Sequence, residues 1–134
     1  MGVEPSLLAT SINCIVAQRL ARRLCMHCRV AYQPTPAELD EMGLAQAAGD
    51  TVLYRPAGCP SCSSTGFSGR VALYEVMTVQ GRLRRLIESG STEEIFAEAL
   101  AQRMTTLRQD GVRLTLAGIS SLDEIRRVTG DRLS

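Results

Sequence analysis

Apolar side chains recur every four residues over the first part of the chain. The repeat comprises Leu8, Ile12, Val16, Leu20 and Leu24. This spacing places them on one face of a helix, and Pro5 suits a first helical turn. The pattern therefore predicts a helix from Pro5 to Leu24, with arginines near its end and Cys14 beside the stripe as a small buried or half-buried residue.

The next part of the chain mixes helical and strand patterns. Thr35 and Glu38 form the two ends of a capping box with proline at the first helical position, which predicts a short helix over 36–43. Small residues over 43–50 indicate a surface loop. Runs of strand length then occupy 52–54 and 70–77, with a turn-rich stretch over 63–69 between them.

Helical spacing dominates from residue 80 onward. Gly90 ends a first helix, and Ser91 begins a second with another capping box. A third helix is expected from about residue 104 to Gly118, and Ser121 with Glu124 caps a last one. The whole pattern predicts an α+β fold that is mostly helical, with a short β element.

Composition and charge exclude several functions. The chain of 134 residues carries 15 basic and 14 acidic side chains, so no surplus of positive charge draws it to nucleic acid. Every basic residue is arginine, which rules out the lysine of a P-loop within this polypeptide. No stretch has the length of a membrane span or the pattern of a secretory leader. We therefore expect a reducing, cytoplasmic setting.

Two Cys-x-x-Cys pairs carry the strongest chemical signal. Cys25 and Cys28 form the first pair, and Cys59 and Cys62 form the second. Paired thiolates at this spacing can converge on one side of a tetrahedral metal ion, and loop closure over the intervening 30 residues costs little. A structural zinc site is the preferred interpretation, with a disulfide or thiol redox chemistry as the alternatives.

A zinc ion bound by four thiolates has no open position for water, so it would stabilise the fold and would not catalyse hydrolysis. Its net negative charge would be offset by Arg22, Arg23 and Arg29. The single histidine, His27, lies between two expected ligands and is predicted to be an exposed spacer. No catalytic constellation is predicted, because one histidine and capping hydroxyls leave no nucleophile with a base.

Several ordered sequence blocks resemble a known family. They are Ala17-Gln-Arg-Leu-Ala-Arg-Arg-Leu-Cys25-Met-His-Cys28, Gly58-Cys-Pro-Ser-Cys62-Ser-Ser-Thr-Gly66, Gly69-Arg-Val-Ala-Leu-Tyr74-Glu75 and Ala117-Gly-Ile-Ser-Ser-Leu-Asp-Glu124. Together they resemble the C-terminal part of the secretion ATPases of type II secretion and type IV pilus assembly. The resemblance implies a helix over 1–24 from the end of a RecA-like core, a tetracysteine zinc-binding subdomain over 25–69, and a strand followed by a helical bundle over 70–134.

The resemblance also implies a division of labour. In that family a RecA-like domain upstream of this region holds ATP and Mg²⁺, and the cytoplasmic hexamer acts on an inner-membrane platform protein. This chain would then be a structural and coupling part, held at the inner membrane through protein partners. The segment between the cysteine pairs, 29–58, is either a docking surface for a partner or a stabiliser of its own subunit.

Two other functions compete with this interpretation. A free-standing zinc ribbon that binds nucleic acid or a protein partner would also carry two cysteine pairs, although the near-neutral charge and scarce aromatic residues argue against nucleic acid. An independent enzyme is the second alternative. The absence of lysine, the single histidine and the closed metal site remove most routes to catalysis.

Overall fold

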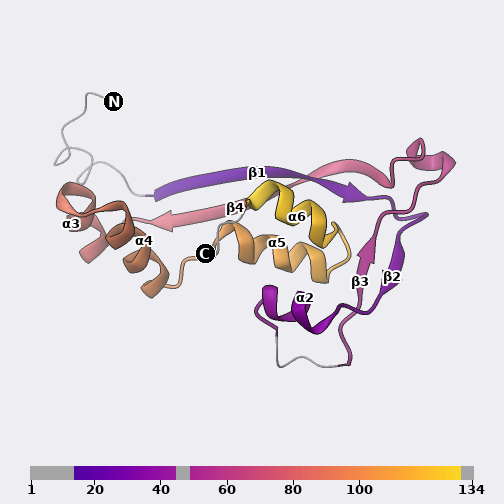
Figure 1. The fold of residues 1–134 in the computed structure, drawn as a ribbon. Helices are drawn as coiled ribbons and strands as arrows, with labels where there is room; N and C mark the ends of the chain where they lie inside the picture. The colour runs from indigo at the N-terminus through magenta and orange to yellow at the C-terminus, as the bar shows by residue number, and fades with distance from the viewer. Residues whose placement is uncertain (1–13, 45–48, 131–134) are drawn as a thin grey trace. The chain divides into compact units, whose positions relative to one another are not determined.

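A computed structural model of the chain describes residues 14–44 and 49–130. The strands are β1 (Cys14–Leu24), β2 (Val30–Tyr32), β3 (Leu53–Arg55) and β4 (Phe67–Thr78), as Figure 1 shows. The helices are α2 (Pro36–Glu41), the short 3₁₀ helix η1 (Pro60–Cys62), α3 (Arg82–Ser89), α4 (Thr92–Ala101), α5 (Leu107–Leu116) and α6 (Leu122–Thr129). β1 pairs with β4, and β2 pairs with β3.

The predicted helix from Pro5 to Leu24 is wrong for the residues that the structure describes. Residues 14–24 form strand β1, and residues 1–13 lie outside the described part. The repeat of four is compatible with both structures, because four is two strand periods as well as about one helical turn. Pairing with β4, more than forty positions later in the chain, decides between them. Cys14 is exposed on this strand and is not a buried residue.

The other local predictions are confirmed with small shifts in boundary. Thr35 accepts a hydrogen bond from the Glu38 backbone, and the Glu38 side chain accepts one from the Thr35 backbone, so the capping box of α2 is complete. Ser91 and Glu94 form the same arrangement at α4. β2 was not predicted, since three residues are too few for a recognisable alternation. Of the predicted loop at 43–50, positions 45–48 lie outside the described residues.

The described residues fall into two compact units. The cysteine unit contains residues 18–44, 49–73 and 107–130, and the α3–α4 unit contains residues 14–17 and 74–106. In the α3–α4 unit, the two helices pack against each other, with Leu83 and Ala99 buried. None of the helices in the described ranges has the length and hydrophobicity that a membrane crossing requires.

A hydrophobic core joins the strands of the cysteine unit to its helices. Ala21 of β1, Leu73 of β4, Leu114 of α5 and Ile125 of α6 are its buried members. Gly111 of α5 allows the close approach, because a Cβ there would lie 2.4 Å from Ile125 Cγ2 and 3.1 Å from Leu73 Cδ2. A larger residue at this position would therefore force Ile125 of α6 or Leu73 of β4 to move.

A second core attaches the segment between the cysteine pairs to the same helices. Its buried members are Leu39 and Met42 from this segment, Leu53 of β3 and Leu122 of α6. Val112 of α5 packs against them. The segment therefore has a hydrophobic contact with the rest of its own unit.

Candidate metal centre

Local structure brings the two cysteine pairs to one place. Cys25 follows the end of β1, and Cys28 precedes β2 by two residues. Antiparallel pairing sets Val30 opposite Arg55 and Tyr32 opposite Leu53. The pairing of β2 with β3 brings the two ends of segment 29–58 together. The chain therefore returns to the neighbourhood of Cys28 before it reaches Cys59 and η1.

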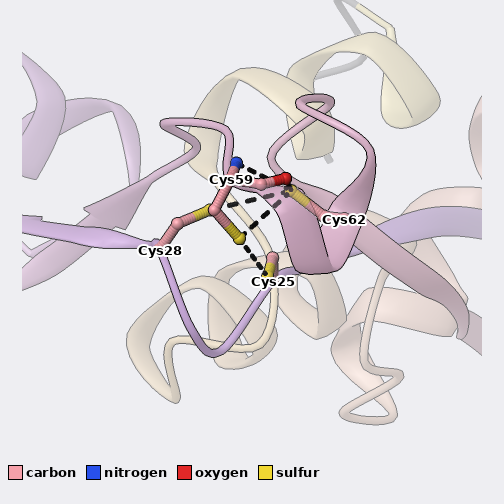
Figure 2. Close-up of side chains that lie close together, drawn as sticks. All are labelled: Cys25, Cys28, Cys59 and Cys62. Atoms are coloured by element: carbon pink, nitrogen blue, oxygen red, sulfur yellow. Dashed lines mark hydrogen bonds between the residues drawn. The ribbon is translucent and has the colours of Figure 1, made fainter.

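The four sulfur atoms converge. They come from Cys25, Cys28, Cys59 and Cys62, all lie within 4.8 Å of one another, and Figure 2 shows the side chains turned toward a common centre. The Sγ–Sγ distances are 3.7 Å for Cys25–Cys59, 3.8 Å for Cys28–Cys62 and 3.8 Å for Cys59–Cys62. A tetrahedral ion with metal–sulfur bonds of about 2.3 Å requires sulfur separations of about 3.8 Å.

Backbone N–H groups point at the sulfur atoms, as is expected where thiolates carry negative charge. Gly58 N donates to Cys28 Sγ at 3.3 Å, and Gly66 N donates to Cys62 Sγ at 3.2 Å. Cys59 N also donates to Cys62 Sγ, at 3.3 Å. A side chain at Gly66 would place its Cβ 2.4 Å from Pro56 Cβ, and φ there is +81°, so the position requires glycine.

The two thiols of the second pair, Cys59 and Cys62, have different pKa values because their surroundings differ. Burial opposes ionisation of Cys62, but backbone hydrogen bonds from Cys59 and Gly66 outweigh it and lower the pKa of the thiol to about 6. Burial raises the pKa of Cys59 to about 11. Within this pair, the thiolate therefore forms at Cys62 at a lower pH than at Cys59.

The structure separates the remaining candidates from this cluster. All five cysteines are free thiols, and Cys14 is not among the four that converge. His27 is exposed and is likewise not a member of the cluster, as predicted for a spacer. The predicted convergence of the four cysteines is thus confirmed.

Two of the three arginines expected beside the cluster bind other groups. Arg22 lies over the Phe67 ring at 4.1 Å and pairs with Glu124 at 2.9 Å. Arg29 lies over the Tyr54 ring at 4.0 Å and donates to the Gly118 carbonyl oxygen at 2.6 Å, at the end of α5. That these arginines offset the thiolate charge therefore stays a prediction. Of the three, Arg23 is the one whose side chain has no hydrogen-bond or ion-pair partner among residues 14–44 and 49–130.

Sequence reasoning missed a carboxylate that ties the segment to the helices. Glu41 accepts hydrogen bonds from Arg108 at 2.7 Å and from Arg126 at 2.6 and 2.8 Å. Hydrogen bonding from Arg126, together with the charge of both arginines, lowers the pKa of Glu41. Arg108 is itself buried and donates to Thr129. No local signal marks these partners, because they lie 67 and 85 positions away.

Comparison with known proteins gives the family. The chain matches the family described as Type II/IV secretion system protein over residues 1–127. The chain belongs to this family. It is 43% identical to the type II secretion system protein E of Klebsiella pneumoniae over 129 residues, and 40% identical to that of Pectobacterium carotovorum over 129 residues. It is 42% identical to the type IV pilus assembly ATPase PilB of Pseudomonas aeruginosa over 133 residues.

The chain corresponds to only part of each of these relatives. The aligned region covers 96–98% of the chain but 23–25% of the three relatives. The predicted resemblance to secretion and pilus assembly ATPases is therefore confirmed at the level of the family.

Proposed function

We propose that this chain is the metal-braced, structural and coupling part of an ATPase that powers type II secretion or type IV pilus assembly. Membership of the family supports the assignment to a secretion or pilus assembly ATPase. The convergence of four cysteine sulfurs supports a structural, metal-binding role for this part of it. In this proposal ATP and Mg²⁺ are bound outside these residues, by a RecA-like core of the same polypeptide. The assembled protein is a cytoplasmic homohexamer that reaches the inner membrane through a platform protein.

Zinc is the proposed ion, with Cys25, Cys28, Cys59 and Cys62 as its ligands. A soft, all-sulfur donor set with tetrahedral spacing fits this ion, and four protein ligands leave no open position. When bound, zinc contributes folding free energy to the surrounding unit. The N–H donors of Gly58, Cys59 and Gly66 hold the thiolates in place. The convergence of the sulfurs is the observation that carries the proposal.

We further propose that the segment between the cysteine pairs braces its own subunit. Its apolar residues pack on α6, and Glu41 is bonded to Arg108 and Arg126. Glu38 is occupied by the capping box of α2, whereas Asp40 is exposed. Of the four acidic residues in segment 29–58, Glu38 and Glu41 therefore have intramolecular partners, whereas Asp40 and Asp50 are exposed.

Replacement of Glu41 by glutamine separates bracing from docking. We expect Glu41→Gln to lower the free energy of unfolding of the metal-loaded chain by about 2 kcal/mol, because the buried Arg108 loses its charged partner. Asp40→Asn, one position away and exposed, is the control and should change it by less than about 0.5 kcal/mol. Equal stability of the two variants in urea unfolding would contradict the bracing role.

ATP turnover tests the division of labour. The purified, metal-loaded chain should neither bind nor hydrolyse ATP, because its sequence contains no lysine for a phosphate-binding loop. The corresponding full-length protein should hydrolyse ATP in the same assay. The proposal would be overturned if ATPase activity copurified with the isolated chain through successive columns.

A further inference from the structure

A hollow with a mixed polar and apolar lining lies beside the cysteine cluster, within the cysteine unit. Its volume is about 270 Å³, and its lining includes Arg23 at the end of β1, His27 between the first two cysteines, Ser61 in η1 and Ser68 in β4. These four side chains are exposed, whereas Leu24 and Cys25 close the inner side. Segments far apart in the sequence thus direct polar groups into one space.

The hollow holds the positive charge of Arg23. No aspartate or glutamate lines it, and within the described residues neither the Arg23 nor the His27 side chain has a hydrogen-bond or ion-pair partner. The arginines on either side in sequence differ in this respect, because Arg22 pairs with Glu124 and Arg29 caps α5. Arg23 therefore presents a guanidinium with its hydrogen-bonding capacity unused.

The donor set selects an anion with two oxygens. A guanidinium binds a carboxylate through two parallel N–H donors, and an imidazole N–H and two hydroxyls can complete its hydrogen bonding. A phosphate dianion is less suitable here, because the adjacent four thiolates with a divalent ion carry a net charge of about −2 and repel a dianion more strongly than a monoanion. An open hollow with exposed walls also suits a side chain presented by another protein surface.

We propose that this hollow, with Arg23 at its centre, receives a glutamate or aspartate side chain from an acidic segment of a partner protein. The proposal concerns residues of this chain alone and does not require the proposed ATPase function. In this proposal the Arg23 guanidinium binds a carboxylate of the partner, whereas Arg22 and Arg29 bind groups of their own unit.

Binding of a fluorescein-labelled hexaglutamate peptide to the metal-loaded chain tests this site by fluorescence anisotropy at low salt. We expect saturable binding that Arg23→Gln weakens roughly tenfold through loss of the charge-assisted hydrogen bonds. Arg19→Gln is the matched control, because Arg19 is an exposed arginine of the same strand that lies outside the hollow and donates to the neighbouring Gln18 carbonyl oxygen. It should change the dissociation constant less than about twofold.

A second variant and two competitors make the outcome decisive. Ser68→Asp should weaken peptide binding, because it places a carboxylate in the hollow, and unchanged metal content shows that each variant is folded. Inorganic phosphate should displace the peptide no better than glutamate at equal ionic strength. Absence of binding to the unaltered chain, equal effects of Arg23→Gln and Arg19→Gln, or tighter Arg23-dependent binding of a single-stranded oligonucleotide would each overturn the proposal.

Discussion

Cys62→Ser is expected to abolish stable metal binding and to unfold most of the cysteine unit. Cys62 is the most heavily bonded of the four cysteines: its sulfur accepts from two backbone N–H groups and lies 3.8 Å from two other sulfurs. Structural zinc contributes on the order of 10 kcal/mol to small domains, which is comparable with their whole stability. We expect the denaturation temperature to fall by more than about 20 °C.

Cys14→Ser provides the control for this experiment. Cys14 is exposed on β1 and is not among the converging cysteines, so the same atomic change there should preserve both metal content and thermal stability. Circular dichroism during heating, with metal content measured on the same samples, compares the two variants. If Cys62→Ser had the same denaturation temperature as the unaltered chain, the cysteine cluster would not be a structural element.

Glu124→Ala should produce the second largest loss, about 3 kcal/mol of unfolding free energy. The Glu124 side chain is 1% exposed and accepts from Arg127, from the Arg22 guanidinium and from the Arg22 backbone N–H. Removal of the carboxylate leaves these donors without their partner and disconnects β1 from α6. This loss lies near the lower end of the range expected when a buried ion pair is broken, because Arg22 and Arg127 both reach solvent.

The neighbouring residue supplies the comparison. Asp123 also belongs to the first turn of α6 and pairs with Arg126, but its side chain is 89% exposed. Asp123→Ala should therefore cost less than about 1 kcal/mol. Urea unfolding of both variants at neutral pH, with metal present, measures the difference. Equal losses from the two substitutions would mean that the buried Glu124 contacts do not stabilise the unit.

The contribution of Glu124 should also depend on pH in a defined direction. Burial opposes its ionisation, but hydrogen bonds from Arg127 and Arg22 prevail and lower its pKa to about 2, from an ordinary value of 4.5. A carboxyl with a lowered pKa stabilises the fold fully above its unfolded pKa and loses that contribution as the pH falls through the folded value. The stability difference between the unaltered chain and Glu124→Ala should therefore shrink as the pH falls from about 5 toward 2.

Local signals in the sequence predicted local structure well. Thr35, Ser91 and their glutamates define helix starts within a few residues, and the structure confirms them. The first strand shows where such reasoning fails, since Val16 and Leu20 satisfy both a helical and a strand period. Only the distant pairing partner in β4 resolves this ambiguity, and a pattern within β1 contains no information about it.

The cysteine cluster was predictable because the Cys-x-x-Cys spacing carries its own geometry. Its attachments were not. Ser121 and Glu124 have the spacing of a capping box, and Ser121 does accept from the Glu124 backbone, but the Glu124 carboxylate binds Arg22, 102 positions away. Glu41 and Arg29 likewise reach partners on α5 and α6 or at their ends. Such contacts depend on how elements pack, which no local pattern specifies.

The most direct test of the central claim is native mass spectrometry of the reduced chain with and without a chelator. We predict one zinc ion per folded chain, its removal by the chelator with a shift to the broad charge-state distribution of an unfolded protein, and its retention in Cys14→Ser but not in Cys62→Ser. A reduced, folded chain that carries no metal ion would contradict the account.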